Sequence, residues 1–164
     1  IFSVAVAVSE AVWIISRSMS AVHFSNVINS GDPIKNRNET VAFAKQSFLI
    51  SLMVLAVAVL LPETVYLLVF GEEFGDVKKL IIYLIPGVVS ISVSNLFGHY
   101  FAGSGKLRVL TYKSLIGLAA TLIILPLLIE KYQLTGVCIA LNVSYILSSL
   151  YLWLTFRKEK NCLT

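Results

Sequence analysis

The chain has 164 residues, of which 57% are hydrophobic and 13% are charged, and 13 Lys and Arg against 9 Asp and Glu give a formal net charge of +4. Soluble domains have about 25% charged residues, so this composition excludes an ordinary soluble domain and indicates an integral membrane protein. The basic excess does not indicate a nucleic-acid partner, because the charged residues lie in the breaks between apolar runs.

The first apolar run begins at the first residue and passes into a more polar stretch that Gly31, Asp32 and Pro33 end. We expect one helix over residues 1–29. Because Ile1 already lies inside an apolar run, we interpret this helix as a truncated span and not as a signal peptide. The sequence is therefore expected to be a fragment of a longer protein.

A second helix is expected over residues 40–61, after a polar loop. Asn38 comes just before an acidic residue and predicts an N-cap for this helix. Pro62 follows the apolar part, and proline is favoured at the first position of a helix. A short separate helix is therefore expected over residues 62–70, with Glu63 near the lipid headgroups.

The third long segment, residues 78–102, lies between the acidic turn FGEEFGDVKK and the basic turn SGKLR. At about 1.5 Å per residue, a helix of this length crosses a hydrocarbon core of roughly 30 Å. Two further helices are expected over residues 109–129 and 137–156, on either side of the break EKYQLTG. The predicted fold class is all-α: a polytopic transmembrane helix bundle of about four complete spans plus a truncated N-terminal span.

The charges at the breaks alternate in sign along the chain. The basic residues on one predicted side of the membrane are Arg17, Lys35, Arg37, Lys45, Lys106, Arg108, Lys113, Arg157, Lys158 and Lys160. The other side has Lys78, Lys79 and Lys131 beside Glu63, Glu72, Glu73, Asp76 and Glu130. Short cytoplasmic loops hold the excess of Lys and Arg in membrane proteins, so we expect a cytoplasmic C-terminus.

No pattern in the sequence indicates an enzyme or a metal site. The string GHYFAGSGK resembles a phosphate-binding loop, but Ser104 stands where the lysine of that motif belongs and no buried strand precedes it. We interpret Gly103 to Lys106 as a tight turn. Cys138 and Cys162 form no disulfide or metal pattern, and no acid/base carboxylate pair or GxSxG motif occurs. We expect no enzymatic activity, no catalytic or metal-binding residue and no cofactor.

Four residues are candidates for substrate binding or ion coupling: Arg17, Glu10, Lys113 and His99. An ionisable residue at membrane depth is costly and usually faces a bundle interior or a wet cavity, and Glu10 and Arg17 are expected to share one helix face. Alternatively, truncation misplaces the bilayer edge and both lie near the surface. His99 can contact an anionic group or be hydrogen-bonded only, and Lys113 can extend to the headgroups.

The tripeptide Asn142-Val143-Ser144 matches an N-glycosylation acceptor, but it lies inside the last predicted helix. Its polar side chains are therefore expected to pack between helices. Pro86 and Pro126 mark bends within two of the predicted spans, and bent helices are common in both transporters and passive spans.

Three segments occur in the order LLVFGEEFGDVKKLI, LFGHYFAGSGKLRVLTYKSLIGL and LIEKYQLTGVCIALNVSYILSSLYL, followed by a basic tail. This order resembles the C-terminal half of the Wzx-type polysaccharide exporters, which flip O-antigen and capsule repeat units. They form the polysaccharide biosynthesis protein family of the multidrug/oligosaccharidyl-lipid/polysaccharide exporter superfamily. The resemblance covers nearly the whole chain and is one of order and spacing, since each segment is degenerate.

The resemblance implies that residues 1–164 form the C-terminal transmembrane lobe of a two-lobe transporter in the bacterial cytoplasmic (inner) membrane. Its substrate would be an undecaprenyl-pyrophosphate-linked oligosaccharide, flipped by alternating access for lipopolysaccharide or capsule biosynthesis. Arg17 would then face the pyrophosphate, and Glu10 would set its charge or couple to an ion. The implied partners are the lipid-linked oligosaccharide, membrane lipid, the N-terminal half of the same protein, and the polysaccharide polymerase and chain-length machinery.

Two alternatives stay open at this point. A multidrug or cation antiporter of the same superfamily would be favoured by acidic residues within the membrane. A membrane scaffold of four or five spans without transport activity would be favoured if Ile1 were the mature terminus.

Overall fold

The computed structural model describes residues 2–30, 32–71 and 77–160, and within these ranges every regular element is an α-helix. In chain order the helices are α1 (Phe2–Glu10), α2 (Val12–Ser30), α3 (Pro33–Leu60), α4 (Glu63–Phe70), α5 (Val77–Gly103) and α6 (Leu107–Lys160). The all-α class predicted from the sequence is therefore confirmed. The acidic turn at 72–76 and Cys162 lie outside the described residues.

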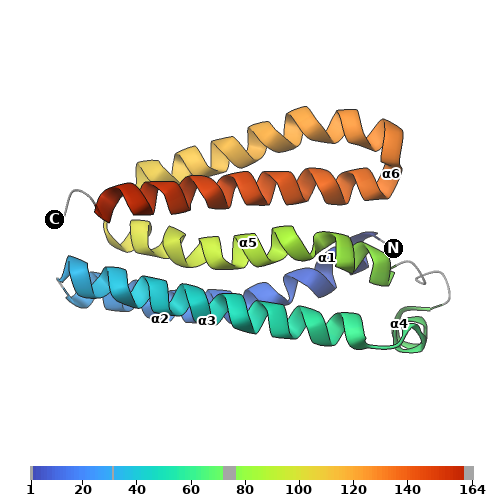
Figure 1. The fold of residues 1–164 in the computed structure, drawn as a ribbon, viewed down its shortest axis with the longest axis horizontal. Helices are drawn as coiled ribbons and strands as arrows, with labels where there is room; N and C mark the ends of the chain where they lie inside the picture. The colour runs from blue at the N-terminus through green and yellow to red at the C-terminus, as the bar shows by residue number, and fades with distance from the viewer. Residues whose placement is uncertain (1, 31, 72–76, 161–164) are drawn as a thin grey trace.

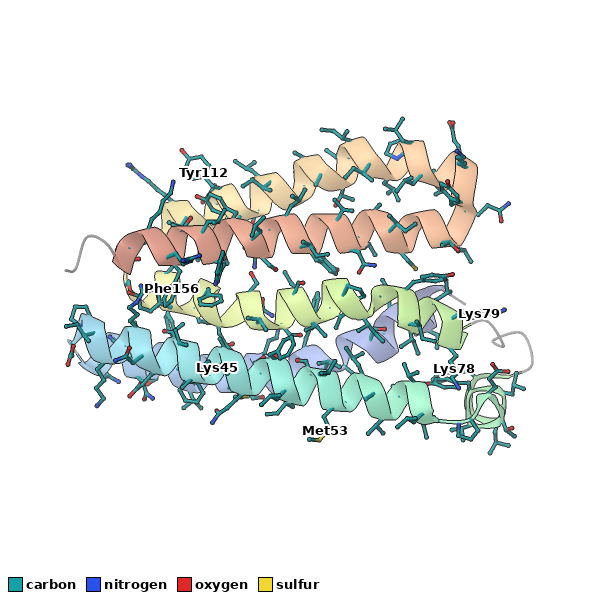
Figure 2. All side chains as sticks on the ribbon, in the orientation of Figure 1. Lys45, Met53, Lys78, Lys79, Tyr112 and Phe156 are labelled. Carbon is teal, nitrogen blue, oxygen red and sulfur yellow. The ribbon has the colours of Figure 1, made fainter. Side chains whose placement is uncertain are left out.

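Helix α5 is the centre of the bundle, because every other helix packs against it. Helix α6 covers one side of α5, while α1, α2 and α3 cover the other (Figure 1). The α2–α3 turn, the α5–α6 turn and the C-terminal end of α6 lie together at one end of the bundle (Figure 1). We call this the basic end, since the residues near these points include Lys35, Arg37, Lys106, Arg108 and Arg157. Figure 2 shows Phe156 at this end and Lys78 at the opposite one.

The helix predicted over residues 1–29 is interrupted at Ala11, between α1 and α2. The N–H of Ile14 donates to the carbonyl of Ala11 at 3.2 Å, which is the i→i+3 bond of a tighter turn. The prediction of one uninterrupted helix is wrong here, because the interruption lies in a run without the Gly or Pro that would announce it. The side chain of Glu10 lies outside the described residues, so the expectation that Glu10 and Arg17 share one helix face stays a prediction.

Helix α3 begins at Pro33, and the prediction of a start at residue 40 with Asn38 as the cap is wrong. The actual N-cap is Asp32, whose carboxylate accepts hydrogen bonds from two N–H groups of the first turn at 2.9 and 3.1 Å. Pro33 occupies the first turn, where its missing N–H costs no hydrogen bond. Because Asp32 gives these N–H groups a partner, the helix already includes the polar residues that follow Pro33.

The short helix predicted after Pro62 is confirmed as α4, with Pro62 as its N-cap. The hydroxyl of the buried Tyr66 donates to the carbonyl of Ala58 at 2.7 Å, which ties α4 to the last turn of α3. Helix α4 ends at Gly71, whose φ of 99° is a left-handed conformation that glycine adopts without strain.

Helix α6 folds back on itself at Gln133, whose φ of 47° and ψ of −126° are not helical. This gives two antiparallel limbs, residues 107–132 and 134–160 (Figure 1), which we call the first and second limb. Both are longer than the two predicted helices, because the polar break EKYQLTG supplies residues to the end of each limb. Gly136 lies so close to the Leu128 carbonyl that a Cβ would collide with it, so the sharp turn requires a glycine.

Asn142 of the second limb joins α5 at its proline. In a regular helix the N–H of Gly87 donates to the carbonyl of Tyr83. Here Asn142 Oδ1 accepts from the Gly87 N–H at 2.8 Å, and Asn142 Nδ2 donates to the Tyr83 carbonyl. The amide therefore bridges both groups beside Pro86, which has no N–H of its own. A Cβ on Gly87 would lie 3.0 Å from the Asn142 Cα, so the contact requires glycine. The prediction that Asn142 packs between helices is confirmed.

Ser144, the third residue of the same tripeptide, joins the two limbs of α6. Its hydroxyl donates to the carbonyl of Gly117 in the first limb at 2.8 Å. A Cβ on Gly117 would lie 2.7 Å from the Ser148 hydroxyl, so the limbs approach closely at a glycine facing two serines. Small residues of this kind allow helix backbones to come close together within a membrane.

The outer surface of the bundle is apolar. Leu60 is 80% exposed and Met53 68%, and Figure 2 shows the side chains of Met53 and Tyr112 pointing away from the bundle. Helical segments long and apolar enough to cross a membrane are Val4–Asn29, Pro33–Leu60, Lys78–Gly103 and Leu107–Glu159. Extensive exposed apolar surface marks contact with lipid or with another protein, and together with these helix lengths it indicates a membrane protein.

Candidate functional site

Three of the four candidate residues predicted from the sequence lie on α5 or on helices that pack against α5. Arg17 is an exposed residue of α2, His99 is a half-buried residue of α5, and Lys113 is a half-buried residue of the first limb of α6. The side chain of the fourth candidate, Glu10, lies outside the described part of the structure.

His99 and Lys113 line the same hollow, a space of about 210 Å³ between α5 and the first limb of α6. Asn95, one turn before His99, lines it too. The other lining residues are Gly98, Ala102 and Leu110. Arg17, like Lys113, lies within electrostatic range of the His99 ring. We call the hollow and Arg17 beside it the cationic cleft.

Helix α2, which carries Arg17, packs closely against α5 beside this hollow. A Cβ on Gly103 would lie 2.8 Å from the Val27 side chain, so glycine allows the two helices to meet. One turn away, the ring of Phe24 meets the His99 ring edge-on, with centroids 6.0 Å apart and planes at 73°. This contact orients the imidazole at the wall of the hollow.

The groups of the cationic cleft suit an anion. Arg presents five N–H donors in a planar fork, Lys presents three, and an asparagine amide adds two more. No carboxylate occurs among the described residues that line the hollow. Phosphate and pyrophosphate groups accept charge-assisted hydrogen bonds from Arg and Lys. Lys113 shares the hollow with His99, and Arg17, on another helix, is within electrostatic range of His99.

A seam of small polar side chains joins α2 to α3 and α5 inside the bundle. The hydroxyls of Ser16 and Ser47 are 2.9 Å apart, and Ser47 also approaches the carbonyl of Ser92 at 3.5 Å. All three side chains are buried. Hydrogen bonds between such residues connect helices where water is excluded, so the seam fixes the mutual position of the three helices.

Buried His23 continues this seam toward the basic end. Its Nε2 lies 2.7 Å from the hydroxyl of Thr40, which also donates to the carbonyl of Asn36 at 2.7 Å. A hydroxyl has one proton to give, so Nε2 carries the proton of the imidazole and donates to Thr40. His23 Nδ1 has no hydrogen-bond partner among the described residues.

The sequence analysis did not select His23 or the serines of the seam. A signal was present, because Ser16, Ser20 and His23 recur at helical spacing on α2, as Thr40 and Ser47 do on α3. Polar residues on one stripe of an apolar helix indicate a face that packs on other helices.

A second and larger hollow lies at the basic end, between α3, α5 and the second limb of α6. It has a volume of about 960 Å³, and we call it the basic groove. The residues that define it are Arg37, Lys45, Phe48, Trp153, Arg157 and Lys158. Sequence reasoning assigned its cations to membrane topology alone, because nothing local relates the start of one helix to the end of another.

Among the described residues, no group of three or more His, Cys, Asp or Glu side chains comes together in a way that could hold a metal ion. No protein-family model, curated protein or solved structure matches this chain. The function is therefore inferred from the side chains that line the two hollows and from the packing of the helices that carry them.

Proposed function

We propose that this chain is one lobe of a bacterial membrane transporter that flips lipid-linked oligosaccharides carrying a pyrophosphate group across the cytoplasmic membrane. The cargo moves from the inner to the outer leaflet for surface polysaccharide synthesis. The pyrophosphate contacts the cationic cleft, and the remaining lobe of the transporter faces the cleft from the other side of a central pathway.

The observation that carries this proposal is the hollow lined by His99 and Lys113, with Arg17 of α2 within electrostatic range of His99. The three residues come from α2, α5 and α6, so the packing of these helices brings together residues from separate parts of the chain. Ionisable side chains within apolar helices are costly and usually belong to a substrate or ion pathway.

The construction of the helices favours a transporter over a passive scaffold. Helix α5 contains Pro86 with its neighbouring backbone groups bridged by Asn142, and α2 is separated from α1 at Ala11. An interruption such as the one between α1 and α2 recurs in secondary transporters, whereas α5 is one continuous helix. A scaffold requires no ionisable side chains that line a hollow, as His99 and Lys113 do here.

The charge of the cleft favours an anionic cargo over the cationic compounds that a multidrug antiporter expels. Arg17 and Lys113 would repel a cation, whereas a pyrophosphate accepts hydrogen bonds from both. Accumulation of ethidium in cells that lack the protein separates the two functions. Increased accumulation without any loss of surface polysaccharide would establish the antiporter in place of the flippase.

The orientation proposed for the bundle places the basic end in the cytoplasm, following the excess of Lys and Arg there. Single cysteines at Lys106 and Thr64, in a protein without its native cysteines, test this with a membrane-impermeant thiol reagent. We expect intact cells to label the Thr64 position only. Labelling of both positions from outside would overturn the orientation.

The function itself is tested by Arg17→Ala and Lys113→Ala in the intact protein. Each is expected to reduce surface polysaccharide at least about tenfold, because a hydrogen bond to a charged group contributes roughly 1.5–3 kcal/mol. Arg108→Gln is the matched control, since Arg108 is an exposed cation of the same limb that does not line the cleft. Unchanged export at unchanged protein level in both cleft variants would refute the proposal.

A further inference from the structure

We propose that the basic groove binds one anionic phospholipid of the surrounding membrane. Its phosphate contacts Arg37, Arg157 and Lys158, and one acyl chain lies along Phe48 and Trp153. This site is separate from the cationic cleft, because it lies between α3 and the second limb of α6, whereas the cleft lies beside α2 and the first limb. The inference does not depend on what the protein transports.

Aromatic contacts hold two of the cations in the groove in place. The Arg37 guanidinium lies 4.3 Å from the centroid of the Phe156 ring and donates to the Phe156 carbonyl at 2.9 Å. The Arg157 guanidinium lies 4.8 Å from the centroid of the Trp153 ring. Side chains that are already positioned lose less conformational entropy when a ligand binds, so the site is prepared for an anion.

The groove is complementary to negative charge. Arg37, Lys45, Arg157 and Lys158 line it, and no Asp or Glu occurs among its described lining residues. Glu159, the acidic residue next to Lys158, lines another hollow and pairs there with Lys106. The positive field within the groove is therefore not neutralised by the carboxylate of Glu159.

The remainder of the groove suits an acyl chain. Phe48 and Trp153 are 44% and 41% exposed, and the walls also include Val41, Leu49, Val93 and Leu154. A smaller hollow of about 300 Å³ shares Phe48 and Trp153 and continues past Ile146. Along the second limb, the distance from Arg157 to Ile146 is roughly 16 Å at about 1.5 Å per residue. The groove is thus largely an apolar slot, with Arg37, Arg157 and Lys158 at one end.

The combination of cations at one end and apolar walls along the rest identifies the chemical class of the ligand. A small soluble anion would satisfy the cations but leave the aromatic walls uncovered. A wholly apolar helix from another protein would cover the walls but bury the cations without partners, which is costly. A phospholipid meets both requirements, and basic pockets between membrane helices on one side of the bilayer bind anionic headgroups. Tryptophan at the polar end of the slot agrees with its preference for the membrane interface.

Native mass spectrometry of the intact protein with phosphatidylglycerol or phosphatidylcholine tests the headgroup requirement. We expect one retained phosphatidylglycerol, and binding at least about tenfold weaker in Arg157→Gln/Lys158→Gln, since each cation near an anionic headgroup contributes about 1 kcal/mol. The control Lys35→Gln/Arg108→Gln removes the same charge from the same end outside the groove. Equal retention by both double variants, or equal retention of the two lipids, would overturn the proposal.

Photo-crosslinking identifies the occupant directly and does not depend on a charge variant that folds well. Benzoylphenylalanine at Leu49, a groove residue that is 62% exposed, is expected to give an adduct with the mass of phosphatidylglycerol. An adduct with a second copy of the chain, or with another segment of the protein, would reject the lipid site. Displacement of phosphatidylglycerol by equimolar undecaprenyl pyrophosphate would also reject it, since the groove would then belong to the transported cargo.

Discussion

The cationic cleft and the basic groove both border α5, but different side chains line them. The cleft measures about 210 Å³ and adds Asn95 and His99 to its cations. The groove measures about 960 Å³ and adds Phe48 and Trp153. Cations alone therefore do not define a ligand. The neighbouring side chains decide whether the site suits a polar anionic group or an anionic group attached to a hydrocarbon chain.

The two hollows also differ in how their cations are held. In the groove, Arg37 and Arg157 rest on the rings of Phe156 and Trp153. In the cleft, the aromatic contact is made by His99 with Phe24, while Arg17 remains exposed. We expect the groove to retain its ligand and the cleft to release it, as a structural lipid and a transported cargo require.

The largest effect is expected from reversing one charge in each hollow. Lys113→Glu should reduce polysaccharide export by at least about tenfold, because a carboxylate repels the pyrophosphate and removes a charge-assisted bond. Lys158→Glu should leave export near normal and weaken phosphatidylglycerol binding. Export assays and native mass spectrometry on both variants would contradict the division between the hollows if the two readouts changed together.

Gly87→Ala tests the element that both hollows share. The new methyl group would collide with Asn142 and displace an amide that bridges two backbone groups of α5. A loss of about 2–3 kcal/mol in stability is expected, with export and lipid binding both reduced. Thermal unfolding in detergent measures the loss. Gly98→Ala is the control for the unfolding measurement only, since its Cβ would meet Leu110 at an ordinary 3.7 Å but Gly98 itself lines the cleft.

Gly103→Ala should affect the cleft alone. Its Cβ would lie 2.8 Å from the Val27 side chain, so α2 must move away from α5 at a cost of about 1–2 kcal/mol. Export should fall while phosphatidylglycerol binding stays unchanged. Val27→Ala in the same chain makes room and should restore export. Failure of this second substitution to restore it would mean that the spacing of α2 and α5 does not control the cleft.

The smallest effect is expected in the polar seam. Ser16→Ala removes the contact with Ser47, and hydrogen bonds between membrane helices contribute only about 0.6 kcal/mol on average. The unfolding temperature should fall slightly, and both hollows should keep their ligands. Ser18→Ala, at an exposed position on the same helix, should change nothing. A large loss of export in Ser16→Ala would place the seam on the transport pathway.

The sequence predicted the helices better than it predicted their ends. Long apolar runs are a local property, and the helical class follows from them. The start of α3 depended on a side-chain bond from Asp32, which competed with an equally plausible cap at Asn38. The interruption at Ala11 carries no Gly or Pro, so no local rule identifies it.

The candidate residues could be selected one at a time but not assembled. His99 and Lys113 stood out because polar residues are rare within apolar helices, yet their common hollow depends on how α6 folds against α5. The groove was missed for the same reason, since Arg37 and Phe156 meet across 119 positions of sequence. Asn142 was assigned to helix packing, but its partner Gly87 lies 55 positions away.

That separation has a consequence for synthesis. When Tyr83 and Gly87 leave the ribosome, Asn142 has not yet been made, so the Gly87 N–H and the Tyr83 carbonyl can only bond to each other or to water. Insertion into lipid favours their mutual bond, because an unsatisfied backbone group there costs several kcal/mol. Helix α5 therefore enters the bilayer with the Gly87 N–H and the Tyr83 carbonyl bonded to each other beside Pro86, and gains the Asn142 bridge only when the second limb arrives. The Asn142 bridge belongs to the finished pair of helices, and a nascent chain truncated before Asn142 would not possess it.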